Sequence, residues 1–250
     1  EWLYNSRNRY AASRSTSHSG RIRVSRRGRL TLFRVDNALL ENILGKIATM
    51  NSTWQEFLCV TGARIENGLV KDFGDIGAEL ASARDATIIS PLVHLGLIEC
   101  SGEEAKSFLH NQLTSDINHL ASGSAQHTAW CTAKGRMLAS FLLYRNGSDY
   151  RALLSSDLLA TIHKRLQMFI LRSRVKIADL SGDHEVIGLS GPQAEVVLHN
   201  AGLPAPASVL ETASFASGSV IRLEGSRWII VVVSVAAAEL WKKLAAMARP

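Results

Sequence analysis

The sequence predicts an α+β fold made of repeated split βαβ (ferredoxin-like) subdomains. Over residues 93–179, segments with strand and helix periodicity follow one another in the order β-α-β-β-(β)-α-β. Most of this order returns over residues 185–248, as β-α-β-β-α. Glycines mark tight connections between neighbouring strands, as at Gly135 and Gly147. Such a pattern places an antiparallel sheet beneath two helices in each unit.

The first unit is centred on a helix predicted over residues 102–113. Ser101 and Glu104 have the spacing of a capping box, and apolar residues follow at helical intervals. The polar run Thr114–Asp116 ends this helix in a loop, because such short side chains favour local hydrogen bonds over a helix interior. Two short strands then form a predicted β-hairpin, namely 125–132 and 137–144.

The other elements are predicted from the same periodicities. A first helix is opened by the capping-box pair Thr53 and Glu56, whereas residues 63–85 have no period and are expected to connect. The remaining predicted strands and helices are 86–90, 93–100, 150–154, 157–171, 172–179, 185–190, 192–202, 218–224, 227–233 and 235–248. The second unit lacks its final strand before Pro250, so we expect an incomplete unit and a truncated chain.

The positive charge is concentrated at the amino terminus. The chain has a formal net charge of +6, but residues 1–49 hold ten Lys and Arg against three acids, while 50–250 hold 18 against 19. We therefore predict a basic, disordered tail over 1–49, a first α+β subdomain with an N-terminal helix over 50–180, and a second over 181–250 that is incomplete at its C-terminus. The near-neutral body is not expected to bind nucleic acid directly.

Two functional readings of the tail compete with plain disorder. Its Arg- and Ser-rich, acid-poor composition is also typical of an organelle transit peptide, and basic arms also bind nucleic acid. The expected location is the cytoplasm, or the mitochondrial matrix if residues 1–49 are a transit peptide. No membrane association is expected, because the most apolar run, Ile229–Leu240, is too short to cross a bilayer.

Cysteine usage predicts neither a disulfide framework nor a metal site. The three cysteines, Cys59, Cys100 and Cys131, are far apart and odd in number, as expected of a reducing compartment. His127 and Cys131 share one face of a predicted strand, but two ligands without a third are typical of packing. Motifs for phosphate loops, zinc proteases and serine hydrolases are absent from the sequence.

Two runs carry a family resemblance. The FLHNQLTSD run at Phe108–Asp116 and the AKGRMLAS run at Ala133–Ser140 resemble the YgfZ-type folate-binding proteins, relatives of the glycine-cleavage T-protein (aminomethyltransferase) family. The resemblance implies a T-protein-like α+β body of repeated subdomains around a folate pocket. It also implies a reduced folate (a tetrahydrofolate derivative) as cofactor, and a role in iron–sulfur cluster assembly or repair with iron–sulfur client proteins, including tRNA-modifying ones.

Six residues are the candidate folate-binding residues, each with a plainer alternative. An amide, a hydroxyl and a carboxylate at a helix end suit the donor–acceptor edge of a pterin, although helix-end capping needs the same groups. Two cations beside the hairpin glycine suit a glutamate tail, although charged hairpin tips are usually solvated. A strand tryptophan suits stacking, although it is often core. These residues are Gln112, Thr114, Asp116, Lys134, Arg136 and Trp130.

The chain departs from the family pattern in three features, of which the first bears on catalysis. The T-protein family has an acidic pair where this chain has Ala139 and Ser140, and neither residue provides the carboxylate that holds and polarises an amine. The segment that grips the pterin corresponds to Arg222–Val233, where Glu224 is the one acid. The first departure argues against aminomethyltransferase-like C1 transfer, the alternative function, and leaves open whether any reaction is catalysed. The second reduces the support for folate binding. The chain is also expected to stop before the family's C-terminal cysteine motif.

Overall fold

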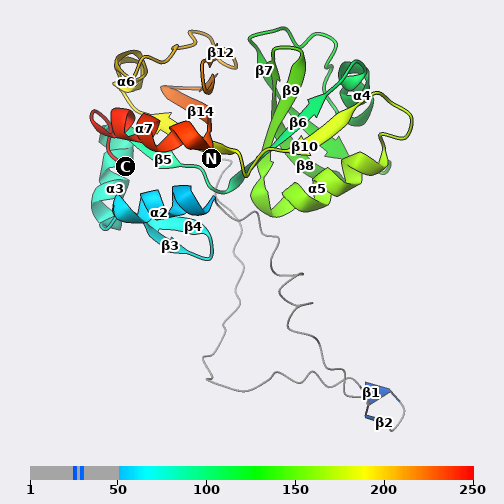
Figure 1. The fold of residues 1–250 in the computed structure, drawn as a ribbon, viewed down its shortest axis with the longest axis horizontal. Helices are drawn as coiled ribbons and strands as arrows, with labels where there is room; N and C mark the ends of the chain where they lie inside the picture. Colours follow the sequence, from blue (N-terminus) through cyan, green and yellow to red (C-terminus); the bar gives the residue numbers. More distant parts are fainter. Residues whose placement is uncertain (1–24, 27–28, 31–50) are drawn as a thin grey trace. The chain divides into compact units, whose positions relative to one another are not determined.

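The computed structural model describes residues 25–26, 29–30 and 51–250 (Figure 1). The chain divides into two units, Glu1–Gly45 and Lys46–Pro250. In the first unit, β1 (Ser25–Arg26) and β2 (Arg29–Leu30) form a short antiparallel pair. The rest of the predicted tail lies outside the described residues.

The second unit alternates helices with short strands. Its helices are α2 (Ser52–Val60), α3 (Ile76–Asp85), α4 (Ala105–Gln112), α5 (Ser156–Met168), α6 (Ala194–Asn200) and α7 (Ser234–Ala245). Its strands are β3 (Arg64–Glu66), β4 (Leu69–Asp72), β5 (Ile88–Pro91), β6 (Leu95–Ser101), β7 (Ala125–Cys131), β8 (Met137–Asn146), β9 (Asp149–Ser155), β10 (Lys176–Asp179), β11 (His184–Ser190), β12 (Thr212–Phe215), β13 (Gly218–Leu223) and β14 (Arg227–Val233). The predicted α+β class is confirmed.

The first large sheet has the strand order β10-β6-β9-β8-β7, and every neighbouring pair is antiparallel. Without the edge strand β7, this is the order of a split βαβ unit, in which the last strand lies beside the first. Helices α4 and α5 cover one face of the sheet. Their apolar stripes, which include Phe108 and Leu166, pack against strand residues such as Phe141 and form the core of this subdomain.

The second large sheet has the order β12-β13-β14-β11-β5. Strand β5 pairs antiparallel with β11, from Ile187 opposite Pro91 to Ser190 opposite Ile88. It therefore occupies the position of the final strand that we expected to be missing from the predicted second subdomain, residues 181–250. That expectation is wrong for the sheet, because the strand comes from nearly 100 residues upstream and sequence order alone does not reveal it.

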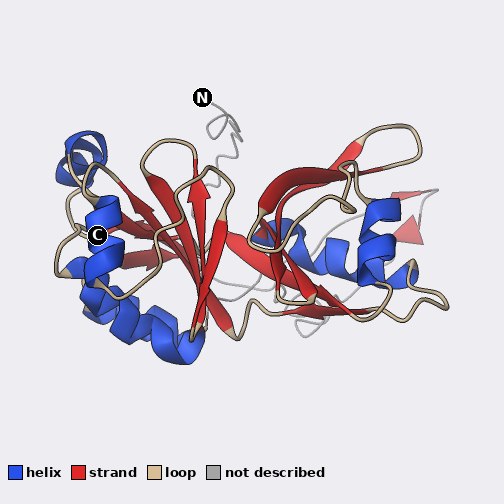
Figure 2. Cartoon of the chain, turned by 90° about the horizontal axis from the view of Figure 1, so that it is seen from above, coloured by secondary structure: helices blue, strands red, loops and turns tan. Residues whose placement is uncertain are grey.

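The two large sheets face each other, and the helices lie on their outer faces (Figure 2). Between the sheets, Leu142 and Tyr144 of β8 pack with Val186 of β11 and Val231 of β14. On the outer face of the second sheet, α2, α6 and α7 bury a further core around Trp241. Because β14 is buried on both faces, its sequence is a continuous apolar run rather than an alternating one.

Two helices begin differently from the prediction. Helix α2 is capped by Asn51, whose Oδ1 accepts hydrogen bonds from the backbone N–H groups of Thr53 (3.0 Å) and Trp54 (3.4 Å). Helix α4 starts at Ala105, because Ser101 belongs to β6 and Glu104 instead accepts a hydrogen bond from the backbone N–H of Arg174. The capping-box spacing was present at both sites but the hydrogen bonds were not.

Residues 63–85 are structured, contrary to expectation. They form the β3–β4 hairpin and α3, and Asp72 accepts two hydrogen bonds from the Arg64 guanidinium across that hairpin. The strands have only three and four residues, and α3 buries only Ser82, so neither element has an apolar period long enough to be recognised in the sequence.

Candidate functional site

The loop after α4 lies along the outer edge of β7. The backbone N–H of Thr114 donates to the carbonyl of Ala129 (2.9 Å), and the N–H of Ala129 donates to Thr114 Oγ1 (3.0 Å). Leu113 forms an antiparallel bridge with Trp130. The loop therefore satisfies an edge that would otherwise present unpaired backbone groups. Ala129 is the hydrogen-bond partner of both the backbone N–H and the side-chain Oγ1 of Thr114.

Ser115 continues this contact by one residue. Its backbone N–H donates to Thr128 Oγ1 (3.3 Å), and its hydroxyl donates to the carbonyl of His127 (2.9 Å). The sequence prediction included the polar residues on either side of Ser115 but not Ser115 itself, although its hydroxyl is the same kind of signal. The backbone of β7 at His127 and Ala129 is thus held by two successive loop residues, Ser115 and Thr114.

Asp116 is exposed, but its carboxylate is engaged locally. Oδ2 lies 2.5 Å from Nδ1 of His119, and Oδ1 accepts a hydrogen bond from the backbone N–H of Asn118 (2.8 Å). Nδ1 of His110 lies 3.3 Å from Oδ1, on the other side of the group. The His119 hydrogen bond, followed by that of Asn118, holds the pKa of Asp116 below its usual value. The carboxylate is therefore ionised and oriented by its neighbours.

Trp130 is a core residue, which does not fit the stacking role considered for it. Its side chain is buried, with only 4% of its surface exposed, in the core beneath α4 and α5. Phe169 packs edge-on against the ring, with 5.6 Å between ring centroids, and the Arg165 guanidinium lies 5.9 Å from the centroid. With these neighbours no indole face is left free for a ligand.

Lys134 and Arg136 lie at the exposed tip of the β7–β8 hairpin. They flank Gly135, whose φ of 74° suits the tight turn, and Thr132 closes the turn by accepting the backbone N–H of Arg136 at Oγ1 (3.1 Å). Within residues 51–250, neither cation forms a salt bridge. The tip thus carries two positive charges available to an anionic group.

Gln112, at the end of α4, is half-buried.

Strand β8 turns Ala139 and Ser140 to opposite faces. Ala139 is 3% exposed and packs with Phe141 beneath the helices. Ser140 is exposed and follows the alternation of Leu142, which faces the second sheet. Of the two positions where the resemblance implies acids, only that of Ser140 is therefore open to a ligand.

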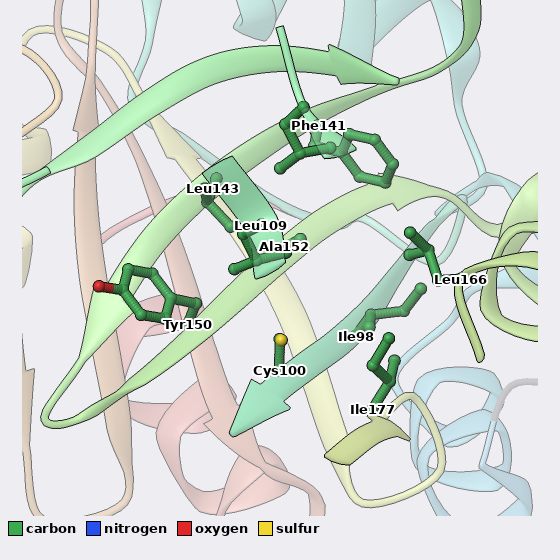
Figure 3. Close-up of a pocket in the computed structure, with 10 residues that line it drawn as sticks. Ile98, Cys100, Leu109, Phe141, Leu143, Tyr150, Ala152, Leu166 and Ile177 are labelled. Carbon is green, nitrogen blue, oxygen red and sulfur yellow. The ribbon is translucent and has the colours of Figure 1, made fainter. Parts of the chain in front are cut away.

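A small cavity lies between the first large sheet and helices α4 and α5 (Figure 3). Its volume is about 20 Å³, close to the space of one water molecule, and burial raises the pKa of the Cys100 thiol in its wall to about 12. None of the six candidate residues lines it. The lining residues are Ile98, Cys100, Leu109, Leu113, Phe141, Leu143, Tyr150, Ala152, Leu166 and Ile177. This apolar cavity is a packing defect of the core, distinct from the predicted site.

Metal ligands do not cluster in the described part of the chain. There, no three His, Cys, Asp or Glu side chains are close enough together to hold an ion. Cys59, Cys100 and Cys131 are free thiols. No helix among the described residues is both long and apolar enough to cross a membrane.

The paired sheets with outer helices define an α+β protein of the glycine-cleavage T-protein type. Residues 63–246 match the GCVT N-terminal domain, and the chain belongs to this family. The fold is also similar to that of the glycine cleavage system aminomethyltransferase T from Bartonella henselae, with a TM-score of 0.69 and 20% identity. That similarity covers 77% of this chain and 56% of the other.

Curated relatives come from two functional groups. The chain is 30% identical over 144 residues to the tRNA-modifying protein YgfZ of Vibrio vulnificus (strain YJ016), which covers 58% of this chain and 43% of the relative. It is 30% identical over 130 residues to the aminomethyltransferase of Bacillus subtilis (strain 168), covering 51% of this chain and 35% of the relative. The chain thus spans less than half the length of either relative.

Proposed function

We propose that the protein binds a reduced folate, a tetrahydrofolate derivative, beside the β7–β8 hairpin without transferring an aminomethyl group. The single observation that carries this proposal is that neither β7 nor β8 contains an acidic residue, while their hairpin exposes a hydroxyl and two cations. Such groups recognise a polar heterocycle with a carboxylate tail, but they provide no negative charge to polarise an amine.

The proposed contacts divide by chemistry. Lys134 and Arg136 attract the glutamate tail of the folate, because they are exposed cations without a described salt bridge. Gln112 offers its amide to the edge of the pterin ring. Thr114 and Asp116 border the site and support it through the hydrogen bonds they make to β7 and to the loop. Trp130 is left out of this set because it is buried.

The second candidate is an aminomethyltransferase-like C1-transfer enzyme, which relatives of that name favour. In the T-protein family, the resemblance places an acidic pair where Ala139 and Ser140 stand here. Ala139 points into the core, and the Ser140 hydroxyl stays neutral at physiological pH. Transfer chemistry therefore has less support than binding.

The wider role follows from the YgfZ-type relatives. A relative named as tRNA-modifying, together with the resemblance, supports an accessory role in iron–sulfur cluster assembly or repair that affects tRNA modification through client enzymes. The proposed location is the cytoplasm, with the mitochondrial matrix as the alternative if residues 1–49 act as a transit peptide. The proposed partners are folate and iron–sulfur client proteins rather than membranes or nucleic acid.

Calorimetric titration with 5-formyltetrahydrofolate tests the binding proposal on the full chain. The expected Kd is tens to hundreds of micromolar, or about 5–6 kcal/mol, as suits an exposed site. A Lys134→Ala, Arg136→Ala double variant should bind more weakly, because the tail loses its counter-charges, whereas Lys176→Ala on the edge strand β10 should bind like the wild type. Absence of wild-type binding would exclude folate as the ligand, and methylene transfer in a coupled assay would favour the enzyme alternative.

A further inference from the structure

The end of α5 and the turn that follows it expose three apolar side chains. Met168, Phe169 and Leu171 are 61%, 48% and 89% exposed. Single exposed apolar residues are normal on a protein surface, but these three lie within four consecutive residues. We call the segment Met168–Arg172 the α5-end surface. Burial within residues 51–250 does not explain why Met168 and Leu171 are apolar.

Leu171 is also held in an unfavourable backbone conformation. Its φ is 45°, in the left-handed region, where a bulky side chain is strained and glycine is not. Because this side chain is almost fully exposed, it gives the fold little in return for that strain. Strained residues are typical of ligand and partner contacts, where the side chain is needed in one fixed position. Leu171 is therefore a candidate for contact with another molecule.

The turn that carries these residues is fixed in place. The backbone N–H of Ser173 donates to the carbonyl of Ile170 (2.8 Å). The backbone N–H of Arg174 donates to Glu104 Oε2 (2.5 Å), and the Arg174 guanidinium pairs with Glu103 (2.5 Å). These contacts tie the turn to the segment before α4. A partner therefore does not have to order the turn, which lowers the cost of binding.

An open groove lies beside Leu171. Its volume is about 630 Å³, and its lining residues are Glu104, Leu171, Arg172 and Ser173. This volume is enough for more than one side chain of a partner. The lining combines an exposed apolar side chain, a cation and a carboxylate that already accepts a backbone N–H. A partner can therefore insert an apolar side chain here and place an anionic group beside Arg172.

The charge around the α5-end surface is positive. Lys164 and Arg165 lie one helical turn before the apolar residues, and Arg172 follows them. All three cations are exposed, and none of them forms a salt bridge with any residue of the range 51–250. Apolar side chains bordered by uncompensated cations suit a partner of opposite charge.

We propose that the α5-end surface binds an acidic segment of a partner protein that carries at least one large apolar side chain. Phe169 and Leu171 contact that side chain, and the three cations face carboxylates of the segment. Two copies of this chain would bring positive surfaces together, and an anionic membrane would meet the carboxylates of Glu103 and Glu104. The proposal goes beyond folate binding and does not depend on it.

A phage-displayed library of random peptides, selected on the full chain, is the probe. Enriched peptides should be acidic and contain large apolar residues. In fluorescence anisotropy, the strongest of them should bind Leu171→Gly and Arg172→Glu at least about tenfold more weakly than the wild type. Val235→Ser, at an apolar residue of α7 that is 94% exposed, and Lys243→Glu are the matched controls and should bind like the wild type. Selected peptides without an acidic excess, or with unchanged affinity for both variants, would overturn the proposal.

Melting temperatures separate loss of this contact from loss of the fold. Glycine adopts a positive φ without strain, so Leu171→Gly should keep or raise the melting temperature while it weakens peptide binding. If it melts lower, the exposed charge reversal Arg172→Glu decides in its place. Analytical ultracentrifugation and co-sedimentation with phosphatidylcholine–phosphatidylglycerol vesicles test the other occupants. A dimer, or vesicle binding, that either variant abolishes would mean that the surface serves that occupant and not an acidic protein segment.

Discussion

Glu185 is a buried carboxyl group that makes the stability of the fold depend on pH. It lies on the helix-covered face of β11, is 6% exposed, and accepts a hydrogen bond at Oε1 from the hydroxyl of Ser234 (2.9 Å). Burial raises the pKa of Glu185 to about 7, although the Ser234 hydrogen bond opposes this shift. The folded protein therefore keeps this proton at pH values where an unfolded chain has lost it.

Glu185→Gln should raise stability above neutral pH. Between pH 4.5 and about 7 the folded state holds one proton more than the unfolded state, so wild-type stability falls as pH rises through this range, by up to about 3 kcal/mol. Glutamine keeps the acceptor for Ser234 and removes the titration, so urea unfolding should show a flatter pH dependence. Glu195→Gln, on the exposed side of α6, serves as control. Equal pH slopes for Glu185→Gln and wild type would contradict the assignment.

At the scale of elements, the loop after α4 behaves as a substitute edge strand for β7. Thr114 is predicted from the sequence to contact a ligand. In the structure, its Oγ1 accepts the N–H of Ala129 and so helps to hold the loop on β7. The diagnostic FLHNQLTSD run therefore has a structural explanation in addition to any contact with a ligand. A short polar segment after a helix indicates a loop, but the strand that the loop covers comes from the tertiary arrangement.

Thr114→Val should destabilise the protein by about 1–2 kcal/mol, because the nearly isosteric side chain leaves the Ala129 N–H without its acceptor. Urea unfolding at a single pH measures the effect. Thr132→Val removes a comparable hydrogen bond at the exposed hairpin tip, where water replaces the acceptor, and should cost less than about 0.5 kcal/mol. Similar losses in the two variants would mean that the loop does not protect the edge of β7.

At the scale of the whole molecule, the two α+β subdomains share one local arrangement at the end of their first strands, β6 and β11. Each strand ends in a serine, a glycine follows, and the next helix begins three residues after that glycine; the glycines are Gly102 and Gly191. Both glycines have positive φ, 111° and 123°, and a Cβ at either would collide with the backbone leading into the fourth strand. That backbone is Arg174–Val175 before β10 and Ala86–Thr87 before β5, so β5 is the structural counterpart of β10.

Gly191→Ala should therefore be strongly destabilising, by about 3 kcal/mol or more, since it combines an unfavourable φ with a backbone collision. The matched control is Gly225→Ala in the β13–β14 turn, where φ is 70° and a Cβ would meet nothing within 4 Å. Its cost should be about 1 kcal/mol. Thermal and urea unfolding compare the two, and equal losses would show that β5 does not approach the glycine as closely as described.

The sequence by itself determined the order and kind of most elements, because the periods of helices and strands are local. The hairpin around Gly135 and helix α5 are examples in which apolar spacing and turn chemistry agree. The two motif runs were also sufficient to predict the family that the match over residues 63–246 then showed. A local pattern, however, indicates how polar and apolar residues alternate along an element, but not which other elements cover its apolar face.

Only the tertiary structure decided which partners those elements have. The pairing of β5 with β11 joins segments nearly 100 residues apart, and such pairing has no local signature in either strand. Trp130 and His127 belong to one strand, yet packing buries the first beneath helices and leaves the second exposed. Burial and strand pairing are properties of the assembled chain, since each depends on atoms contributed by residues far away in the sequence.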